Sequence, residues 1–266
     1  MSQFGFIGIG NMGGAIAAAV AKSVDPRQIL VSAKSEAHAR DFAGTYGVTA
    51  SDNETIARQA KFVVLGVKPQ FMGEVLGALK PILEVRTDCV LVTMAAGMTM
   101  NMISNLVGGG YPVIRIMPNT PARVGQGVIL YDANDRVHKE DLEEFLEALK
   151  PAGMLDPLPE RLIDAGSAVA GCGPAFACMF LEALADGGVA CGLPRAKATE
   201  YAAQMVLGTA QLLMQSGEHP GVLKDAVCSP GGSTIQGVRA LEDGGLRGTV
   251  MEAVIAAYEK SKEFSK

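Results

Sequence analysis

Several features that would point to nucleic acids or membranes are scarce in this sequence. The chain has no run of lysine or arginine, and its 266 residues carry a net charge of −5. Nucleic acids and anionic membranes are recognised largely through basic patches, so neither is expected as a partner. No segment reaches the roughly 18 continuous apolar residues of a membrane span, and the N-terminus lacks the features of a signal peptide. We therefore expect small-molecule ligands and a cytoplasmic location.

Cysteine and histidine are too few and too scattered for a metal site or a disulfide framework. The five cysteines form no CxxC pair, and their apolar surroundings predict reduced, buried thiols. The three histidines lie far apart in the sequence among polar neighbours. Metal sites need ligands at short, characteristic spacings, so we expect no bound metal.

The first dozen residues are the most informative part of the chain. Residues 4–7 are predicted as a short buried strand, which leads through a Gly-Ile-Gly-Asn-Met-Gly turn into an alanine-rich helix. In a dinucleotide-binding turn of this form, the first glycine permits the tight turn, the second lets the pyrophosphate approach, and the third lets the helix pack on the strand. The alternative is a glycine turn kept for packing alone. The predicted cofactor-binding residues of this turn are Ile7, Gly8, Gly10, Asn11, Met12 and Gly13.

The first part of the chain alternates strands with helices, and the second part does not. This alternation predicts a Rossmann-type α/β fold over residues 1–156, with a doubly wound, mostly parallel sheet covered on both faces. Residues 157–266 have helical periodicity throughout, which predicts an all-α domain. The predicted strands are 28–32, 61–67, 89–93, 112–116 and 128–131, and the predicted helices of the first part include 37–43 and 140–150.

The predicted helix over residues 174–191 is apolar almost all the way round, so it must be surrounded by protein. A domain of about 110 residues struggles to enclose such a helix, and a second copy would supply the missing wall. We therefore predict an interlocked homodimer; a larger ring of dimers stays open. Glu182 and Asp186 are interpreted as hydrogen-bonding groups at the dimer interface rather than as an acid-base pair.

The residues that follow the second strand favour NADPH over NADH. An NADH site usually has an acidic residue there, which accepts hydrogen bonds from the ribose hydroxyls. This chain has Lys34 and Ser35 instead, a cation and a hydroxyl that suit a phosphate. The alternative is that Lys34 is an ordinary solvated lysine and that Glu36 plays the acidic part, so NADH remains a second cofactor.

Further candidate contacts follow the buried strands at their carboxyl ends, the edge where open parallel sheets bind ligands. Lys68 suits a phosphate or the nicotinamide ribose, and the small residues after the next strand would let a flat ring lie against the backbone. Ordinary turn chemistry is the alternative for each segment. The segments are Val67-Lys68-Pro69, Met94-Ala95-Ala96-Gly97 and residues 115–121.

A second glycine-rich turn lies near the C-terminus and enters a helix that Ser233 or Thr234 is predicted to cap. Such a turn offers several backbone N–H groups to an anion, here a substrate carboxylate. Capping alone would explain Ser233 but not the proline and two glycines before it. The predicted substrate-binding residues are Ser229, Gly231, Gly232, Ser233 and Thr234.

On these motifs the chain resembles the pyrroline-5-carboxylate reductase family from Phe4 to the last helix. The resemblance implies NAD(P)H in the first domain, a helical domain that dimerises by interlocking, and an active site between one subunit's nucleotide domain and the helical domains of the dimer. Where the family more often has serines, this chain has Ala170 and Cys172. The motifs that carry the resemblance are residues 8–13, 67–69, 117–121, 171–176, 184–189 and above all 229–235.

The resemblance also implies roles for individual residues. Ser233 and Thr234 would hold the substrate, with Thr234 as the hydroxyl that hydrogen-bonds the ring nitrogen and relays its proton. The implied reaction is hydride transfer to the C=N carbon of 1-pyrroline-5-carboxylate, which gives L-proline in the last step of proline biosynthesis. On the cofactor side, Lys34, Ser35 and Asn53 would contact the adenosine half, and Gly66, Val67, Lys68, Pro69, Met94, Ala95 and Ala96 would cradle the ribose and nicotinamide.

Two other functions are alternatives. A β-hydroxyacid dehydrogenase has a similar nucleotide motif followed by a helical domain, but it needs a lysine on the first long helix, and residues 171–186 contain none. A dinucleotide-sensing protein without turnover would need no second anion pocket, so the turn at residues 229–234 argues against it.

Overall fold

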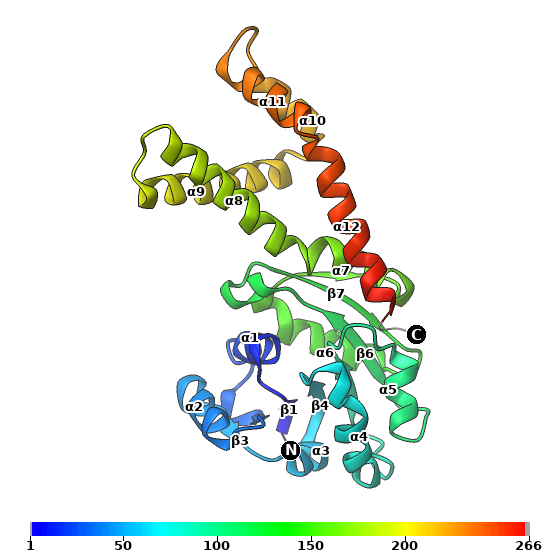
Figure 1. The fold of residues 1–266 in the computed structure, drawn as a ribbon. Helices are drawn as coiled ribbons and strands as arrows, with labels where there is room; N and C mark the ends of the chain where they lie inside the picture. Colours follow the sequence, from blue (N-terminus) through cyan, green and yellow to red (C-terminus); the bar gives the residue numbers. More distant parts are fainter. Residues whose placement is uncertain (1, 264–266) are drawn as a thin grey trace. The chain divides into compact units, whose positions relative to one another are not determined.

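The computed structural model describes residues 2–263 (Figure 1). The described residues form two compact units, one of residues 2–172 with residues 257–263 and one of residues 173–256. We refer to them as the first unit and the helical unit. Helix α7 (Glu160–Ala170) belongs to the first unit by this division. The domain limit expected after residue 156 stays a prediction.

The described residues of the first unit form one eight-stranded sheet in the order β3-β2-β1-β4-β5-β6-β7-β8. Neighbouring strands are parallel except β6 and β7. This confirms the Rossmann-type fold, although β3 and β8 were not predicted, because β3 has two residues and β8 is a half-exposed edge strand that ends in proline. The strands are β1 (Ser2–Ile7), β2 (Ile29–Ser32), β3 (Thr49–Ala50), β4 (Ala60–Leu65), β5 (Val90–Thr93), β6 (Val113–Met117), β7 (Gly127–Ala133) and β8 (Gly153–Pro157).

Helices cover both faces of this sheet, and each face has its own apolar core (Figure 1). On one face Phe4 of β1 stacks on Phe62 of β4 with ring centroids 5.0 Å apart, next to Phe145 of α6. On the other face Leu65 packs with Met72 of α4 in a separate cluster. The remaining elements of the first unit are α1 (Asn11–Val20), α2 (Glu36–Tyr46), α3 (Asn53–Gln59), α4 (Pro69–Leu83), α5 (Met100–Leu106), α6 (Lys139–Leu149) and the short 3-10 helices η1 (Pro26–Gln28), η2 (Thr120–Val124) and η3 (Lys150–Ala152).

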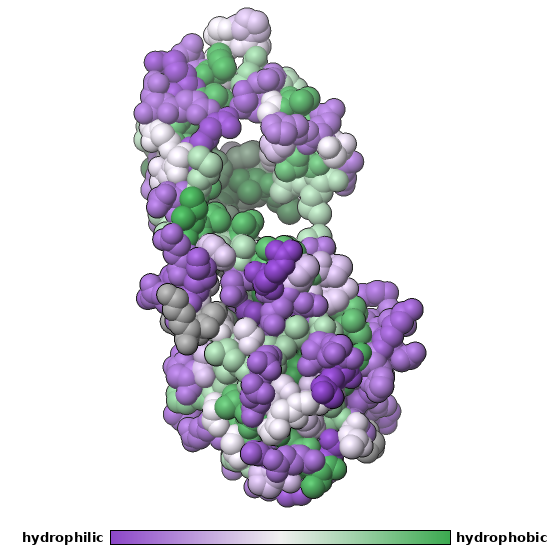
Figure 2. Space-filling model, turned by 90° about the vertical axis from the view of Figure 1, so that its right-hand side faces the viewer, coloured by the Kyte–Doolittle hydropathy of each residue, from purple (hydrophilic) through white to green (hydrophobic). Residues whose placement is uncertain are grey.

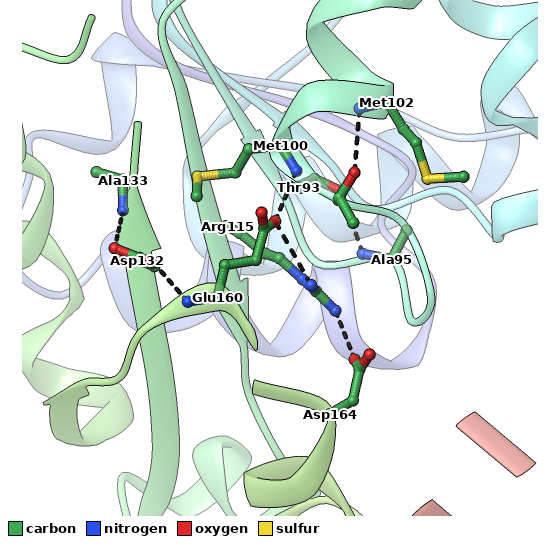
Figure 3. A network of polar contacts seen from close by, with 10 residues as sticks. Thr93, Ala95, Met100, Met102, Arg115, Asp132, Ala133, Glu160 and Asp164 are labelled. Atoms are coloured by element: carbon green, nitrogen blue, oxygen red, sulfur yellow. Dashed lines mark hydrogen bonds and ion pairs between the residues drawn. The ribbon is translucent and has the colours of Figure 1, made fainter. Parts of the chain in front are cut away.

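A network of charged side chains around the buried Arg115 holds the start of α7 on the sheet (Figure 3). Arg115 of β6 is 1% exposed, and its Nη2 donates to Oδ1 of Asp164 at 2.6 Å. Its Nη1 donates to Oε1 of Glu160 at 3.5 Å, and that oxygen also accepts from the backbone N–H of Met100 at 2.7 Å. Asp132 of β7 accepts from the backbone N–H of Glu160 at 2.6 Å. Three parts of the first unit therefore fix one helix end.

The other end of α7 is held by Asn119, which follows β6. The side-chain amide of this buried residue donates to the backbone carbonyl of Ala170 at 2.9 Å. Its Oδ1 accepts from the backbone N–H of Val128 at 2.9 Å. Because both ends of α7 are bonded to strands or loops of the sheet, this helix is part of the first unit although its sequence continues into the helical one.

The helical unit contains only helices and turns in its described residues, which confirms the all-α prediction. Helix α8 packs against α9, but the buried residues of this unit are small: Ala185, Ala198 and Ala202. Large apolar side chains instead lie on its surface, where Figure 2 shows them as green patches. The helices are α8 (Gly173–Ala190), α9 (Arg195–Ser216), α10 (Pro220–Ala226), α11 (Ser233–Asp243) and α12 (Leu246–Glu263), the last of which runs past the end of the unit.

Two expectations about side chains change in this structure. All cysteines are free, but Cys89 is the one that is buried. Cys178 on α8 and Cys191 directly after it are exposed, because little of the same chain covers this helix. Asp186 forms an ion pair with Arg195 of its own chain at 2.6 Å, so it already has a partner without a second copy. Within residues 2–263, no three histidine, cysteine, aspartate or glutamate side chains gather as a metal site requires.

Residues 160–190 are long and apolar enough, by length and composition, to cross a membrane, which the sequence had not led us to expect. In the structure they form two helices, α7 and α8, separated by a turn at residues 171–172. Length and composition do not distinguish a membrane span from a helix that packs against other protein.

Candidate functional site

The carboxyl ends of four parallel strands meet at one edge of the sheet. Ile7 of β1 lies opposite Ser32 of β2 on one side and Leu65 of β4 on the other. Leu65 in turn lies opposite Thr93 of β5. The chain segments that follow these strands are therefore neighbours, and the strand order reverses between β1 and β4. Such a switch point is where doubly wound sheets bind dinucleotides.

The glycine turn after β1 packs too closely for side chains. Gly8 has a φ of +95°, which favours glycine. A Cβ on Gly13 or on Gly66 would collide with the carbonyl oxygen of Gly8. A Cβ on Gly10, by contrast, would meet no atom within 4 Å. The space in front of Gly10 is thus open, as the approach of a pyrophosphate requires.

The first N–H groups of α1 lie next to this space, because the helix begins at Asn11 directly after Gly10. Gly10 is the N-cap and provides no side-chain cap, and the first turn contains no acidic residue. Free N–H groups and the helix dipole favour an anion here. Arg123 of η2 donates from Nη2 to Oδ1 of Asn11 at 3.1 Å and adds a positive charge beside the turn. Sequence reasoning missed Arg123, since its proximity to Asn11 follows only from the fold.

The predicted adenosine contacts gather at a cavity of about 1060 Å³ beside the end of β2. Lys34 and Asn53 both line it. Ser32 donates from its hydroxyl to Oδ1 of Asn53 at 2.6 Å and so orients that amide. Ser35 accepts from the backbone N–H of His38 at 3.4 Å and caps α2, so its hydroxyl already has a structural role.

Two further cations of this cavity were not predicted from the sequence. Arg40 of α2 and Arg58 of α3 both line it, and each is paired with a glutamate one turn earlier on its own helix. The distances are 3.3 Å for Glu36 to Arg40 and 3.4 Å for Glu54 to Arg58. The spacing of such pairs is visible in the sequence, but it is typical of any solvated helix face. The fold shows that both helices face one cavity.

The carboxylate of Asp52 in the same cavity stays ionised at neutral pH. The backbone N–H of Thr55 donates to it at 2.8 Å, and the hydroxyl of Thr55 does so at the same distance. These bonds to the charged form lower the pKa of Asp52 from its ordinary value. The carboxylate caps α3, and the two arginines of the cavity pair with Glu36 and Glu54 instead.

The predicted nicotinamide contacts follow β4 and β5. Lys68 is exposed and precedes Pro69, the first residue of α4. Ala95 is buried and its N–H donates to the hydroxyl of Thr93 at 3.3 Å, while Ala96 is exposed. This stretch of backbone therefore presents small side chains, which leave room for a flat ring.

The second glycine turn belongs to the helical unit, and its capping differs from the prediction. Helix α11 begins at Ser233 with Gly232 as its N-cap, so neither Ser233 nor Thr234 caps it. The backbone N–H of Gly232 donates to the carbonyl of Ser229 at 3.0 Å, and Gly231 has a φ of +68°. Within the described part of the chain, the exposed hydroxyls of Ser233 and Thr234 make no hydrogen bond. The turn thus offers free donors to an anion such as a carboxylate.

Models of known protein families match both parts of the chain that contain these sites. Residues 160–264 match the family model for pyrroline-5-carboxylate reductase dimerisation. Residues 3–97 match the model for NADP oxidoreductase, coenzyme F420-dependent. The two matches fall on the helices from α7 onward and on the glycine turn with the cavity beside β2.

Relatives with similar sequences extend over the whole chain. The pyrroline-5-carboxylate reductase of Escherichia coli (strain K12) is 39% identical, over 99% of this chain and 98% of its own length. That of Pisum sativum is 42% identical over 98% of this chain and 95% of its own length. The crystal structure of Plasmodium falciparum pyrroline carboxylate reductase with NADP bound has a TM-score of 0.90 at 32% identity, over 99% of this chain and 98% of that one. The chain therefore belongs to the pyrroline-5-carboxylate reductase family.

Proposed function

We propose that this protein reduces 1-pyrroline-5-carboxylate to L-proline with NADPH as the preferred cofactor and NADH as the second. The observation that carries the proposal is the 39% identity to the Escherichia coli pyrroline-5-carboxylate reductase over nearly the full length of both chains. A β-hydroxyacid dehydrogenase is not favoured, since α8 contains no lysine to act as the base.

The residues of the first unit fit a dinucleotide. The open space at Gly10 and the uncapped N-terminus of α1 suit a pyrophosphate. Lys34 and Asn53 would hold the adenosine half, and the segments after β4 and β5 would hold the ribose and nicotinamide. When bound, NADPH supplies the hydride for the C=N carbon. The role of the protein is to position the two reacting carbons and to exclude water.

The 229–234 turn would hold the substrate. The N–H groups of Gly231, Ser233 and Thr234, unlike that of Gly232, have no acceptor in the described chain and suit the carboxylate of the imino acid. The hydroxyl of Thr234, which makes no hydrogen bond in the described chain, would bond to the ring nitrogen and relay its proton. A cyclic imine takes up a proton from water near neutral pH, so the site needs no strong acid.

The assembly is a homodimer in this proposal. Matching of residues 160–264 to a dimerisation model supports it, as does the exposure of Met179 and Phe180 on α8, whose side chains are 69% and 40% exposed. The family implies an active site between one subunit's nucleotide domain and the helical domains of the pair. We place the enzyme in the cytoplasm, without nucleic acid or membrane partners. The proposal is compatible with a larger assembly built from several dimers.

Steady-state kinetics test the function. The purified protein should oxidise NADPH when supplied with 1-pyrroline-5-carboxylate and should form proline in equal amount. Incubation with NADP and β-hydroxy acids should give no reduced cofactor. Turnover of hydroxy acids, or binding of nucleotide without turnover of either substrate class, would contradict the proposal in favour of a dehydrogenase or a sensor.

A further inference from the structure

The cavity beside β2 contains opposing charges on one short stretch of helix. Glu36 begins α2 and Arg40 follows one turn later, and both line the cavity with Lys34. Oε2 of Glu36 lies 3.3 Å from Nη2 of Arg40. A carboxylate at this place suits the ribose hydroxyls of NADH, and a guanidinium suits the 2′-phosphate of NADPH. The chain therefore has a group for each cofactor.

The ion pair between these two side chains is easily exchanged. The side chain of Arg40 is 69% exposed and that of Glu36 is 85% exposed. Exposed pairs at this spacing contribute little to stability, because water screens the charges and both side chains lose conformational freedom. A phosphate that carries nearly two negative charges would compete well with one solvated carboxylate for the guanidinium.

We propose that Glu36 and Arg40 determine cofactor choice by exchanging partners. With NADPH, Arg40 leaves Glu36 and binds the 2′-phosphate together with Lys34. With NADH, Glu36 accepts hydrogen bonds from the ribose hydroxyls while Arg40 remains its neighbour. The inference rests on the proposed dinucleotide site and adds to it the two residues that discriminate between the cofactors.

Lys34 and Arg40 differ in what they contribute to this choice. Within the described residues, Lys34 makes no side-chain hydrogen bond or ion pair, so its charge is available to either cofactor. Arg40 has a planar fork that binds two phosphate oxygens at once, which a lysine ammonium does not do. The preference for a 2′-phosphate therefore depends on Arg40 more than on the neighbouring lysine.

Equilibrium titration with NADPH and NADH, read by the fluorescence of the cofactor itself, tests the exchange. Arg40→Gln should weaken NADPH binding about tenfold, as loss of a charge-assisted bond predicts, and NADH binding by less than about twofold. The NADPH affinity of Arg40→Lys should lie between that of the wild type and that of Arg40→Gln. Glu36→Gln should act in the opposite direction: NADH binding about threefold weaker and NADPH binding tighter.

A matched pair on another helix provides the control. Lys139 and Glu143 form an exposed pair with the same spacing on α6, 3.6 Å apart, and neither lines the cavity. Lys139→Gln should leave both affinities unchanged. The proposal is overturned if Arg40→Gln weakens the binding of NADPH and NADH equally, or if it weakens the binding of neither. It is also overturned if Glu36→Gln leaves NADH binding unchanged. Since binding is measured without substrate, these results do not depend on which imine or hydroxy acid the enzyme reduces.

Discussion

The two units of this chain differ in how they bury apolar side chains. The first unit encloses Phe4, Phe62 and Leu65 almost completely on the two faces of its sheet. The helical unit buries little more than alanines and leaves side chains such as Met179 and Met214 mostly exposed. A sheet covered on both faces completes its own core, whereas a few helices of this length need a partner surface. The contrast explains why the match to a dimerisation model, and the interface that we propose, fall on the helices of the second unit.

The largest effect is expected from a charge on the surface of α8, because it should prevent the helical unit from covering its apolar side chains with a partner. Met179→Glu places a carboxylate where the proposed partner would pack, and burial of an unpaired charge is costly. We expect monomers in sedimentation and loss of nearly all reductase activity. Val85 of the first unit is 80% exposed, so Val85→Glu is the control and should change neither the assembly in sedimentation nor the activity. A fully dimeric, active Met179→Glu protein would show that this face of α8 is not an interface.

Removal of the buried guanidinium should destabilise the first unit. Arg115→Met removes the buried guanidinium that pairs with Glu160 and Asp164, whose side chains are 25% and 18% exposed. Breaking a buried pair costs about 3 to 5 kcal/mol, and we expect the lower end of this range because both carboxylates keep contact with water. Urea unfolding at fixed protein concentration measures this loss. Adding Glu160→Gln and Asp164→Asn to the variant should restore part of it. If the single variant unfolds like the wild type, the network does not secure α7.

The exposed turn of the helical unit should be needed for activity and not for folding. Thr234 makes no cap and no hydrogen bond in the described chain, so Thr234→Ala should leave the melting temperature unchanged. Turnover should fall at least about tenfold, as expected for loss of a positioned proton relay. Thr209→Ala removes an exposed helix threonine of the same unit and is the control. Unchanged kinetics of Thr234→Ala would remove this residue from the mechanism.

The smallest effect concerns a thiol inside the first unit. Burial raises the pKa of Cys89 from 9.0 to about 11. Below pH 9 the thiol is mostly protonated in both the folded and the unfolded protein. Above pH 9 the thiol ionises in the unfolded protein first, so the free energy of unfolding falls as the pH rises toward 11. By pH 10 the loss is about 1 kcal/mol, which follows from 1.36 kcal/mol per pKa unit. Cys89→Ala should show a flatter decline of unfolding free energy between pH 8 and 10; an identical slope would contradict this.

The sequence was sufficient where a local pattern has a single structural meaning. The glycine turn after Ile7 and the turn at residues 229–232 were predicted by composition and order. The buried strand β4 was predicted too, although its end was expected at Val67 and lies at Leu65. Side-chain partners were not predictable, because they depend on elements distant in sequence. For example, the fold of the sheet brings Asn119 to the backbone carbonyl of Ala170. It also brings Arg40 and Arg58, which are on different helices, to one cavity. The cap of α11 was mispredicted because Gly232 takes the N-cap position that a serine usually occupies.

A crystal structure of the dimer with NADP and L-proline tests the central claim most directly. We predict the proline carboxylate within hydrogen-bond distance of the backbone N–H groups between Gly231 and Thr234, with C5 of proline against the nicotinamide. Proline bound elsewhere, with the 229–234 turn in contact with solvent only, would contradict the account.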